Sequence, residues 1–249
     1  MVFVRDRKEI DAIAEAARIV AMTLDELERC LKPGVTTGEL DRVAEEFIRS
    51  HGGRPAFKGY RGFPASICPS VNEEVVHAIP GARALKAGDI VGIDVGVEKN
   101  GFYGDAARTM AVGEVRPEVK KLLEVARGAL LAGIGQAQAG RRLGDVSHAI
   151  QAHVETNGFS IVRDLVGHGI GREMHEEPQV PNYGSPDRGP KLIAGQVLAI
   201  EPMVNMGGHD VMTRPDGWTV VTKDGSLSAH FEHTVAVGAD GAEILSTVK

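Results

Sequence analysis

One pattern occurs twice along this chain, two amphipathic helical segments followed by short apolar stretches, and it restricts the folds that the chain can adopt. Two of the matches have nearly the same spacing, which favours an internal duplication over chance similarity of glycine-rich segments. The matching stretches are 34–52 with 140–158, 87–94 with 194–201, and 109–113 with 234–238. The repeat predicts one domain over residues 1–249, with pseudo-twofold halves of about 6–115 and 117–245. Since no linker-like run separates the halves, we expect one continuous sheet.

Hydrophobic periodicity and start signals predict two helices in each half. Asp6 with Glu9, and Thr36 with Glu39, have the spacing of a capping box, in which the first side chain and the acid three residues later satisfy free backbone amides. Pro117 suits the first turn of a third helix. The rest of the chain alternates apolar stretches with Gly and Pro turns, so we expect an α+β fold. The predicted helices begin at Asp6, Thr36, Pro117 and Leu143.

Four carboxylates lie in apolar stretches that we interpret as strands, and one imidazole accompanies them. A buried carboxylate is costly unless a positive group pairs with it. Only Arg108 stands near any of the four acids in sequence. These residues are Asp94, Asp105, Glu201 and Glu232, together with His168. Their pattern indicates a site for divalent metal, with two ions that share bridging carboxylates.

Composition and charge narrow the classes of function. The 249 residues carry a net charge of −6 with both signs interspersed, and no Lys or Arg cluster forms a stripe, so nucleic acid is not expected as a substrate. No apolar run approaches the ~18–20 residues of a membrane span, and the first residues lack the apolar core of a signal peptide. The only cysteines, Cys30 and Cys68, fit a reducing compartment. We therefore expect a cytoplasmic protein without a membrane partner.

Seven motifs together are specific although each alone is weak. They are Asn-Glu-Glu-Val-Val-His-Ala-Ile-Pro at 72–80, Ile-Asp-Val-Gly at 93–96, Gly-Asp-Ala-Ala-Arg-Thr at 104–109, Val-Gly-His-Gly-Ile-Gly-Arg at 166–172, Met-His-Glu-Glu-Pro at 174–178, Ala-Ile-Glu-Pro-Met at 199–203, and the stretch 216–233 that begins Asp-Gly-Trp. In this order and spacing the chain resembles the type I methionine aminopeptidases over nearly its whole length. The resemblance implies the pita-bread fold, in which duplicated helix–helix–strand halves form a curved antiparallel sheet backed by helices.

The resemblance also implies a ligand set. Asp94 would bind one ion, Asp105 and Glu232 would bridge the pair, and His168 and Glu201 would complete the shell of the other ion. One imidazole among oxygens suits Co, Mn, Fe or Zn better than Mg or Ca. A water held between two such ions ionises near neutral pH, and the hydroxide can attack an amide carbonyl.

Three residues are expected to act on the substrate by the same resemblance. His77 would contact it near the scissile amide, and His175 would hydrogen-bond the scissile carbonyl and stabilise the tetrahedral intermediate. Glu201 would serve as general base and proton shuttle. His230 and His233 flank Glu232 and could orient the ligands around it.

An apolar pocket should receive a methionine side chain. By position its lining residues are Phe57, Tyr60, Phe63, Cys68, Met174 and Trp218. Many family members have Cys in place of Phe57, Tyr in place of Phe63 and Phe in place of Met174. All three positions remain apolar, so a thioether-sized pocket is still expected, with a shape altered by the flexible Met174.

The implied function is removal of the initiator methionine from nascent proteins when the second residue is small. The expected partner is the N-terminal peptide of a nascent chain, with the ribosome as a further family expectation, and we expect a monomer. One alternative keeps the fold and metals but cleaves next to proline, as an aminopeptidase or dipeptidase. Such relatives carry a large N-terminal domain, for which the chain has no room. Another alternative is a binding module without metals, against which the intact ligand set argues.

Overall fold

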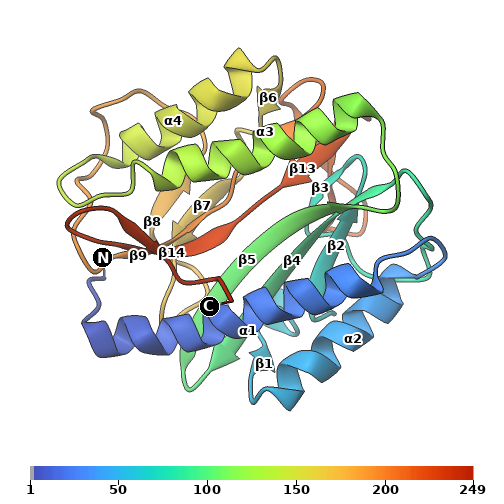
Figure 1. The fold of residues 1–249 in the computed structure, drawn as a ribbon, viewed down its shortest axis with the longest axis horizontal. Helices are drawn as coiled ribbons and strands as arrows, with labels where there is room; N and C mark the ends of the chain where they lie inside the picture. The colour runs from blue at the N-terminus through green and yellow to red at the C-terminus, as the bar shows by residue number, and fades with distance from the viewer. Residues whose placement is uncertain (1–2, 249) are drawn as a thin grey trace.

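The computed structural model describes residues 3–248, and the four α-helices of this range lie on one side of the strands (Figure 1). Helices α1 (Arg7–Cys30) and α2 (Thr37–Ser50) cover the strands of the first half. Helices α3 (Pro117–Ile134) and α4 (Leu143–Thr156) cover those of the second half. None of these helices is long and apolar enough to cross a membrane. The expected α+β class, with two helices per half, is confirmed.

The helix starts follow the predicted capping chemistry. The Asp6 side chain accepts a hydrogen bond from the Glu9 amide at 2.9 Å. Thr36 and Glu39 form a complete capping box, because the Glu39 amide donates to the Thr36 hydroxyl at 3.1 Å and the Thr36 amide donates to the Glu39 carboxylate at 2.7 Å. Pro117 occupies the first turn of α3. All four predicted starts agree with the structure to within one residue.

The strands form antiparallel sheets, of which the two largest belong to different halves. The first sheet has the order β1-β4-β2 with β5 also paired to β4, and the second has the order β15-β14-β9-β7-β8. Two three-stranded sheets, β13-β10-β6 and β11-β12-β3, complete the set. In chain order the strands are β1 (Arg54–Pro55), β2 (Ile67–Val71), β3 (Glu74–Val76), β4 (Ile90–Lys99), β5 (Phe102–Ala111), β6 (Ser160–Ile161), β7 (Val166–Gly169), β8 (Glu176–Pro181), β9 (Val197–Ile200), β10 (Met203–Asn205), β11 (Val211–Thr213), β12 (Val220–Thr222), β13 (Ser228–His230), β14 (His233–Val237) and β15 (Ala242–Ile244).

The expectation of one continuous sheet is wrong at the line where the halves meet, which we call the seam. There β5 runs beside the segment that joins β13 to β14 (Figure 1). Between β5 and that segment there is one backbone hydrogen bond, from the Glu232 amide to the Ala107 carbonyl at 2.9 Å. Side-chain hydroxyls bond the backbone on either side of it, so the two are adjacent without a ladder. Elsewhere the halves are joined by the pairing of β3 with β12.

Two threonines make the seam symmetric. The Thr109 hydroxyl donates to the His230 carbonyl and accepts from the His230 amide, both at 2.8 Å. The Thr234 hydroxyl donates to the Asp105 carbonyl at 2.7 Å and accepts from the Asp105 amide at 3.0 Å. Because the two threonines act in the same way from opposite sides, we propose that the halves are related by a pseudo-twofold axis at the seam.

Each half has its own apolar core. One cluster packs α1 and α2 against β2, β4 and β5, with Leu27, Leu40 and Ile93 fully buried. The other packs α3 and α4 against the second set of strands, around Leu122 and Ile150. The seam therefore lies between two independently supported layers, and both cores hold it in place.

The seam predicts a measurable loss of stability when either hydroxyl is removed. Thr109→Val or Thr234→Val keeps the shape but leaves a buried amide and carbonyl without their partner, which costs about 1–3 kcal/mol. Urea unfolding should show this loss for each variant. Thr23→Val is the matched control, because the Thr23 hydroxyl bonds only to Ile19 within its own helix. Equal losses in all three variants would contradict the role given to the seam.

Candidate metal centre

The five predicted ligands come from both halves and gather at the seam. Asp94 lies on β4, Asp105 on β5 and His168 on β7. Asp94, Asp105, His168 and Glu232 are buried, and the Glu201 side chain is 14% exposed. The structure thus brings together residues that are more than one hundred positions apart in sequence.

Two of the five do not lie inside strands as we expected. Glu201 follows the last residue of β9, and the next residue is Pro202, which has no amide to continue a ladder. Glu232 lies between β13 and β14, where its amide bonds across the seam to Ala107 instead of to a neighbouring strand. Both carboxylates therefore project from strand ends at the seam.

Buried oxygens without partners identify the site as one for a cation. Asp94 Oδ1, Asp105 Oδ1 and Glu232 Oε1 are buried and have no hydrogen-bond donor among residues 3–248. Buried polar atoms are almost always satisfied in folded proteins. Orphaned oxygens of three neighbouring carboxylates therefore fit the binding of positive ions, and the donor set of oxygens with one imidazole fits divalent metal.

The distances around His168 are those of groups arranged about a shared ion. Ligand atoms of Asp105, His168 and Glu232 lie within 4.8 Å of one another. His168 Nε2 is 3.9 Å from Asp105 Oδ2 and 3.5 Å from Glu201 Oε1. These separations are too long for good hydrogen bonds, so the atoms surround a small space instead of bonding to each other.

His168 presents the nitrogen that a metal requires. Its Nδ1 lies 2.8 Å from the Gly169 carbonyl oxygen, which can only accept, so Nδ1 carries the hydrogen. Nε2 then has a free lone pair on the side of the carboxylates. Burial lowers the pKa of His168 to about 4, so the ring is neutral near pH 7. A backbone carbonyl that fixes the tautomer in this way is the usual partner of a metal-binding histidine.

The carboxylates have high affinity for protons when no cation is present. Burial raises the pKa of Asp94 to about 7. Burial and the charge of Glu232 raise the pKa of Asp105, and burial with the charge of Asp94 raises that of Glu201. Burial and the charge of Glu201 raise the pKa of Glu232. Protons and metal ions therefore compete for the same oxygens.

Of the other predicted histidines, His175 and His230 lie at the candidate centre, whereas His233 bonds to a residue outside it. The His175 ring lies against that of His168, with centroids 4.2 Å apart and planes tilted by 43°, and burial lowers the pKa of His175 to about 3. His230 Nε2 is 3.9 Å from Glu201 Oε2 and is buried without a hydrogen-bond partner in the described chain. His233 instead bonds through Nδ1 to Ser246 Oγ at 2.8 Å.

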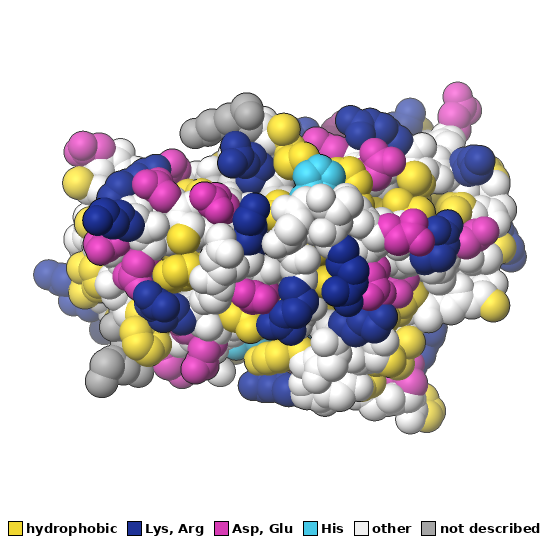
Figure 2. Space-filling model, turned by 90° about the horizontal axis from the view of Figure 1, so that it is seen from below, with side chains coloured by type: hydrophobic (Ala, Val, Ile, Leu, Met, Phe, Trp, Pro, Cys, Tyr) yellow, Lys and Arg dark blue, Asp and Glu magenta, His cyan; other side chains and the backbone are white. Residues whose placement is uncertain are grey.

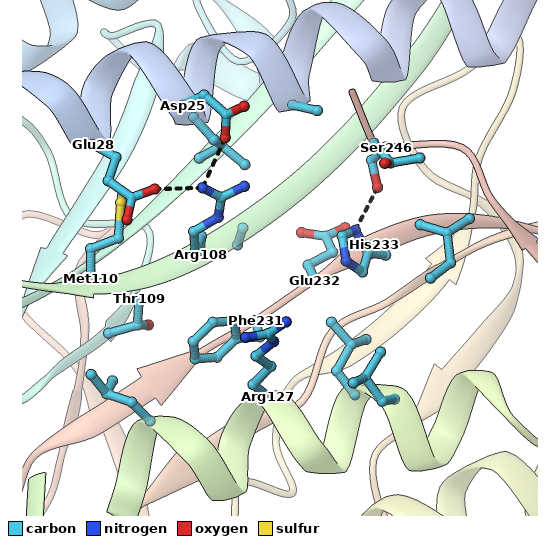
Figure 3. A pocket seen from close by; sticks show the side chains of 18 of the residues that line it. Asp25, Glu28, Arg108, Thr109, Met110, Arg127, Phe231, Glu232, His233 and Ser246 are labelled. Atoms are coloured by element: carbon cyan, nitrogen blue, oxygen red, sulfur yellow. Dashed lines mark hydrogen bonds and ion pairs between the residues drawn. The ribbon is translucent and has the colours of Figure 1, made fainter. Parts of the chain in front are cut away.

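Ser246 and His233 line a pocket of about 1160 Å³ on the helix side of the seam, between α1 and α3 (Figure 3). Arg108 enters the same pocket and pairs with Asp25 and Glu28 of α1, at 3.0 and 2.7 Å. The only cation near Asp105 in sequence is thus bound to other acids. Within residues 3–248, no lysine or arginine side chain therefore bonds to the carboxylates of the candidate centre.

His77 is held in a strained loop by a charge cluster that the sequence analysis missed. Its φ of 59° lies in the left-handed region, and burial lowers its pKa. Three residues earlier, the buried Glu74 accepts from Arg83 at 2.9 Å, from Arg214 at 2.6 Å and from the Val71 amide at 2.8 Å. An acid in the apolar run before His77, with Arg83 nine residues later, was the available signal. Glu74 ties the loop of His77 to the loop that leads to Trp218.

The six residues assigned to the substrate pocket form one cluster. Phe57, Phe63, Cys68 and Met174 are buried together, with Tyr60 and Trp218 packed against them. Phe63 meets Trp218 edge to face, with centroids 5.1 Å apart. The backbone of Cys68 lies opposite Asp94 in the β2–β4 pairing, so the cluster adjoins the candidate centre.

Gly96 defines one wall of this cluster and was not predicted. It follows Asp94 by two positions on β4, so both face the same side. A Cβ at Gly96 would lie 2.6 Å from Met174 Cε and 2.6 Å from Phe57 Cε1. The phenyl ring and the thioether therefore occupy space that any other residue at this position would need.

A cavity of about 460 Å³ opens beside the candidate centre. His168, His175 and Arg61 line it, together with Glu173, Glu176 and Gln179.

On the face of the molecule seen in Figure 2, Lys and Arg side chains are interspersed with Asp and Glu. The expectation that no basic stripe forms holds for that face.

Comparison with known proteins gives the same family throughout. Residues 11–239 match metallopeptidase family M24. A methionine aminopeptidase of Clostridium perfringens is 56% identical over 249 residues, which cover 100% of both chains. The crystal structure of a methionine aminopeptidase from Thermotoga maritima has a TM-score of 0.98 at 47% identity and covers 100% of both chains. A prolidase from Pyrococcus furiosus shares the fold alone, with a TM-score of 0.81 at 20% identity over 99% of this chain and 66% of that one. The expected pita-bread fold is confirmed.

The raised carboxylate pKa values predict how pH acts on the metal-free protein. Above about pH 4 the buried carboxylates hold more protons in the folded state than in the unfolded state, so their contribution to the free energy of unfolding falls as pH rises. Up to about pH 6.5 the buried histidines, whose pKa values are lowered, act in the opposite direction. Scanning calorimetry of metal-free protein should therefore show Tm falling from pH 7 to 8.5, where the histidines are neutral in both states. Added Mn²⁺ should raise Tm more at pH 7.5 than at pH 5.5, because fewer protons compete.

The variants Asp94→Asn and Asp11→Asn separate the titration of the buried carboxylates from the effect of a change in net charge. The first removes a buried titrating group and should flatten the fall in Tm, whereas the second changes an exposed residue and should not. A metal-free Tm that rises over the same range in every variant would contradict the electrostatic account of the centre.

Proposed function

The chain belongs to metallopeptidase family M24, and we propose on this basis that it removes the initiator methionine from nascent proteins when the second residue is small. The observation that carries the proposal is that two clusters lie side by side. One is a cluster of buried carboxylates whose oxygens lack hydrogen-bond donors, and the other is an apolar cluster that suits a thioether. The first can support hydrolysis of an amide and the second can select methionine. Relatives over the full length are methionine aminopeptidases.

We propose that the centre holds two divalent ions. Asp94 would bind one, Asp105 and Glu232 would be shared, and His168 with Glu201 would complete the shell of the other. Ions of the class of Co, Mn, Fe or Zn would polarise a carbonyl there and lower the pKa of water. The donor types define this class of ions, and metal analysis of purified protein would identify the native one.

The chain's own residues would position the substrate and move the proton. The cluster around Phe57 and Met174 would hold the methionine side chain, so that the scissile amide lies beside Asp94. Glu201 Oε would take the proton from the attacking water and give it to the leaving amine. His77 and His175 would contact the scissile amide and its oxygen.

The proposal also covers the substrate, the compartment and the partners of the enzyme. The substrate is the free N-terminus of a nascent peptide, and we propose that the enzyme acts in the cytoplasm as a monomer, at or near the ribosome. Neither nucleic acid nor membrane is a substrate. The place of action follows from the chemistry of the substrate, because the initiator methionine is exposed as a new chain leaves the ribosome.

The two alternatives are less well supported. Proline-specific peptidases share the fold at 20% identity, which says nothing about the substrate. A metal-free binding module would have no need for buried carboxylate oxygens without partners. Both alternatives remain outcomes of the assay that follows.

The proposal is tested by methionine release from Met-Ala-Ser, beside alanine release from Ala-Pro-Ala, with metal-free protein and with Co, Mn, Fe or Zn added. We expect metal-dependent cleavage of the methionine peptide alone. Glu201→Gln should lower kcat by about 10²–10⁴ because the proton shuttle is lost. Glu46→Gln, an exposed change on α2, is the control. Cleavage of the proline peptide alone, or of neither peptide under any metal, would refute the proposal.

Gly96 provides a test of the pocket. Gly96→Ala would push Phe57 and Met174 into the space for the methionine side chain, so kcat/KM for Met-Ala-Ser should fall about tenfold or more, mainly through KM. Gly184→Ala is the control, because its Cβ would make only an ordinary contact at 3.4 Å. An unchanged KM in Gly96→Ala would show that this cluster is not the methionine pocket.

A further inference from the structure

We propose that Tyr60 is a positioning residue for His175: its hydroxyl donates to His175 Nδ1 and thereby keeps the hydrogen on Nε2, ready for the substrate carbonyl. Sequence position had assigned Tyr60 only to the apolar wall of the pocket. The inference rests on the proposed function, because it concerns the oxyanion donor of that reaction. Tyr60 would then form a functional hydrogen bond in addition to lining the pocket with its ring.

Three contacts determine where the His175 ring lies. Tyr60 Oη is 2.8 Å from His175 Nδ1, and the two rings stack with centroids 5.3 Å apart and planes at 22°. On its other side His175 packs against His168 at 4.2 Å. The ring is therefore held between a tyrosine from the first half and a metal-ligand candidate from the second.

The backbone does little to hold His175. It is the residue immediately before β8, at the end of a turn over residues 171–175, outside any strand pairing. A side chain on such a segment depends on its own contacts for a fixed orientation. Loss of the Tyr60 hydroxyl would leave only ring packing, which permits rotation of the imidazole about its bond to Cβ.

The direction of the hydrogen bond decides the tautomer. A neutral imidazole has one N–H and one lone pair, and a phenol can donate or accept. The phenol is the stronger acid and the imidazole nitrogen the stronger base, so O–H to N is the favoured arrangement. With Nδ1 accepting, the hydrogen lies on Nε2, the nitrogen farther from Tyr60. His168 has the opposite tautomer, with its hydrogen on Nδ1.

The turn that carries Tyr60 is itself organised for this contact. Gly59 has φ 86°, Gly62 has φ 89° and Arg61 has φ 49°, so three left-handed residues surround Tyr60. Gly59 and Phe63 close the turn, since the Gly59 amide donates to the Phe63 carbonyl at 2.8 Å. The Arg61 guanidinium lies over the Tyr60 ring at 5.3 Å. A turn with this much local constraint fixes the hydroxyl before any substrate arrives.

Preorganisation of a donor matters because it costs no rearrangement when charge develops on the carbonyl oxygen. Removal of an oxyanion donor lowers kcat by about 10²–10³. If Tyr60 only positions such a donor, loss of its hydroxyl should cost less, about 10- to 100-fold in kcat. KM should change little, since the aromatic ring still lines the pocket.

Tyr60→Phe tests the inference through two readouts. In metal-free protein, ¹⁵N NMR of His175, assigned with His175→Gln, should show the Nε2–H tautomer in the parent chain and a mixture in Tyr60→Phe. In metal-loaded protein, kcat for Met-Ala-Ser should fall about 10- to 100-fold with KM within about threefold. Tyr103→Phe is the matched control, because Tyr103 is also half-buried but bonds toward Arg54 and not toward the centre. Unchanged thermal unfolding would show that each variant folds.

The outcomes separate this inference from the proposed function. If the parent chain releases methionine and Tyr60→Phe matches it in tautomer and kcat, or changes only KM, Tyr60 is simply part of the wall and the inference is refuted. If the tautomer of His175 changes in Tyr60→Phe while no chain releases methionine, the coupling stands and the proposed function fails. A tautomer already mixed in the parent chain would also overturn the inference.

Discussion

Burial of four carboxylates around one imidazole, with no lysine or arginine bonded to them in residues 3–248, is the constraint on which the rest of this structure depends. Such a cluster is unstable by itself, because its members repel one another and lose hydration. Its pKa values rise, and its oxygens lack donors. Only a bound cation or bound protons can offset the free-energy cost of burying these charges. The residues proposed to perform the chemistry therefore also give the folded chain its affinity for metal.

The position of the centre at the seam explains how the folded state tolerates the free-energy cost of the buried carboxylates. The centre lies where two sheets meet, and each sheet is backed by its own helices and core. Thr109 and Thr234 satisfy the backbone of His230 and Asp105 where a ladder would otherwise be needed. Ligands from both halves are therefore held by strands or strand ends. Loops and turns supply three groups that would face the substrate, which are His77, His175 and Tyr60. That division suits a reaction in which the metals must be fixed and the substrate must enter and leave.

Local signals in the sequence predicted the helices and the identity of the candidate ligands. Capping pairs such as Thr36 and Glu39 act over three residues, and an acid inside an apolar stretch is visible without any knowledge of its partners. Long-range contacts have no such signal. The bond between Thr234 and Asp105 spans 129 residues, that between Arg214 and Glu74 spans 140, and that between Tyr60 and His175 spans 115. The position of Glu201 at a strand end could have been predicted from Pro202, because proline cannot continue the ladder.

Anomalous diffraction from crystals grown with Mn²⁺ or Co²⁺ would test the central claim most directly. The account predicts two ions at the seam, about 3.5–4 Å apart, with Asp105 and Glu232 bonded to both. Asp94 should bind one ion only, and His168 should bind the other through Nε2. A single ion at saturating metal, or ions bound away from these five side chains, would contradict it.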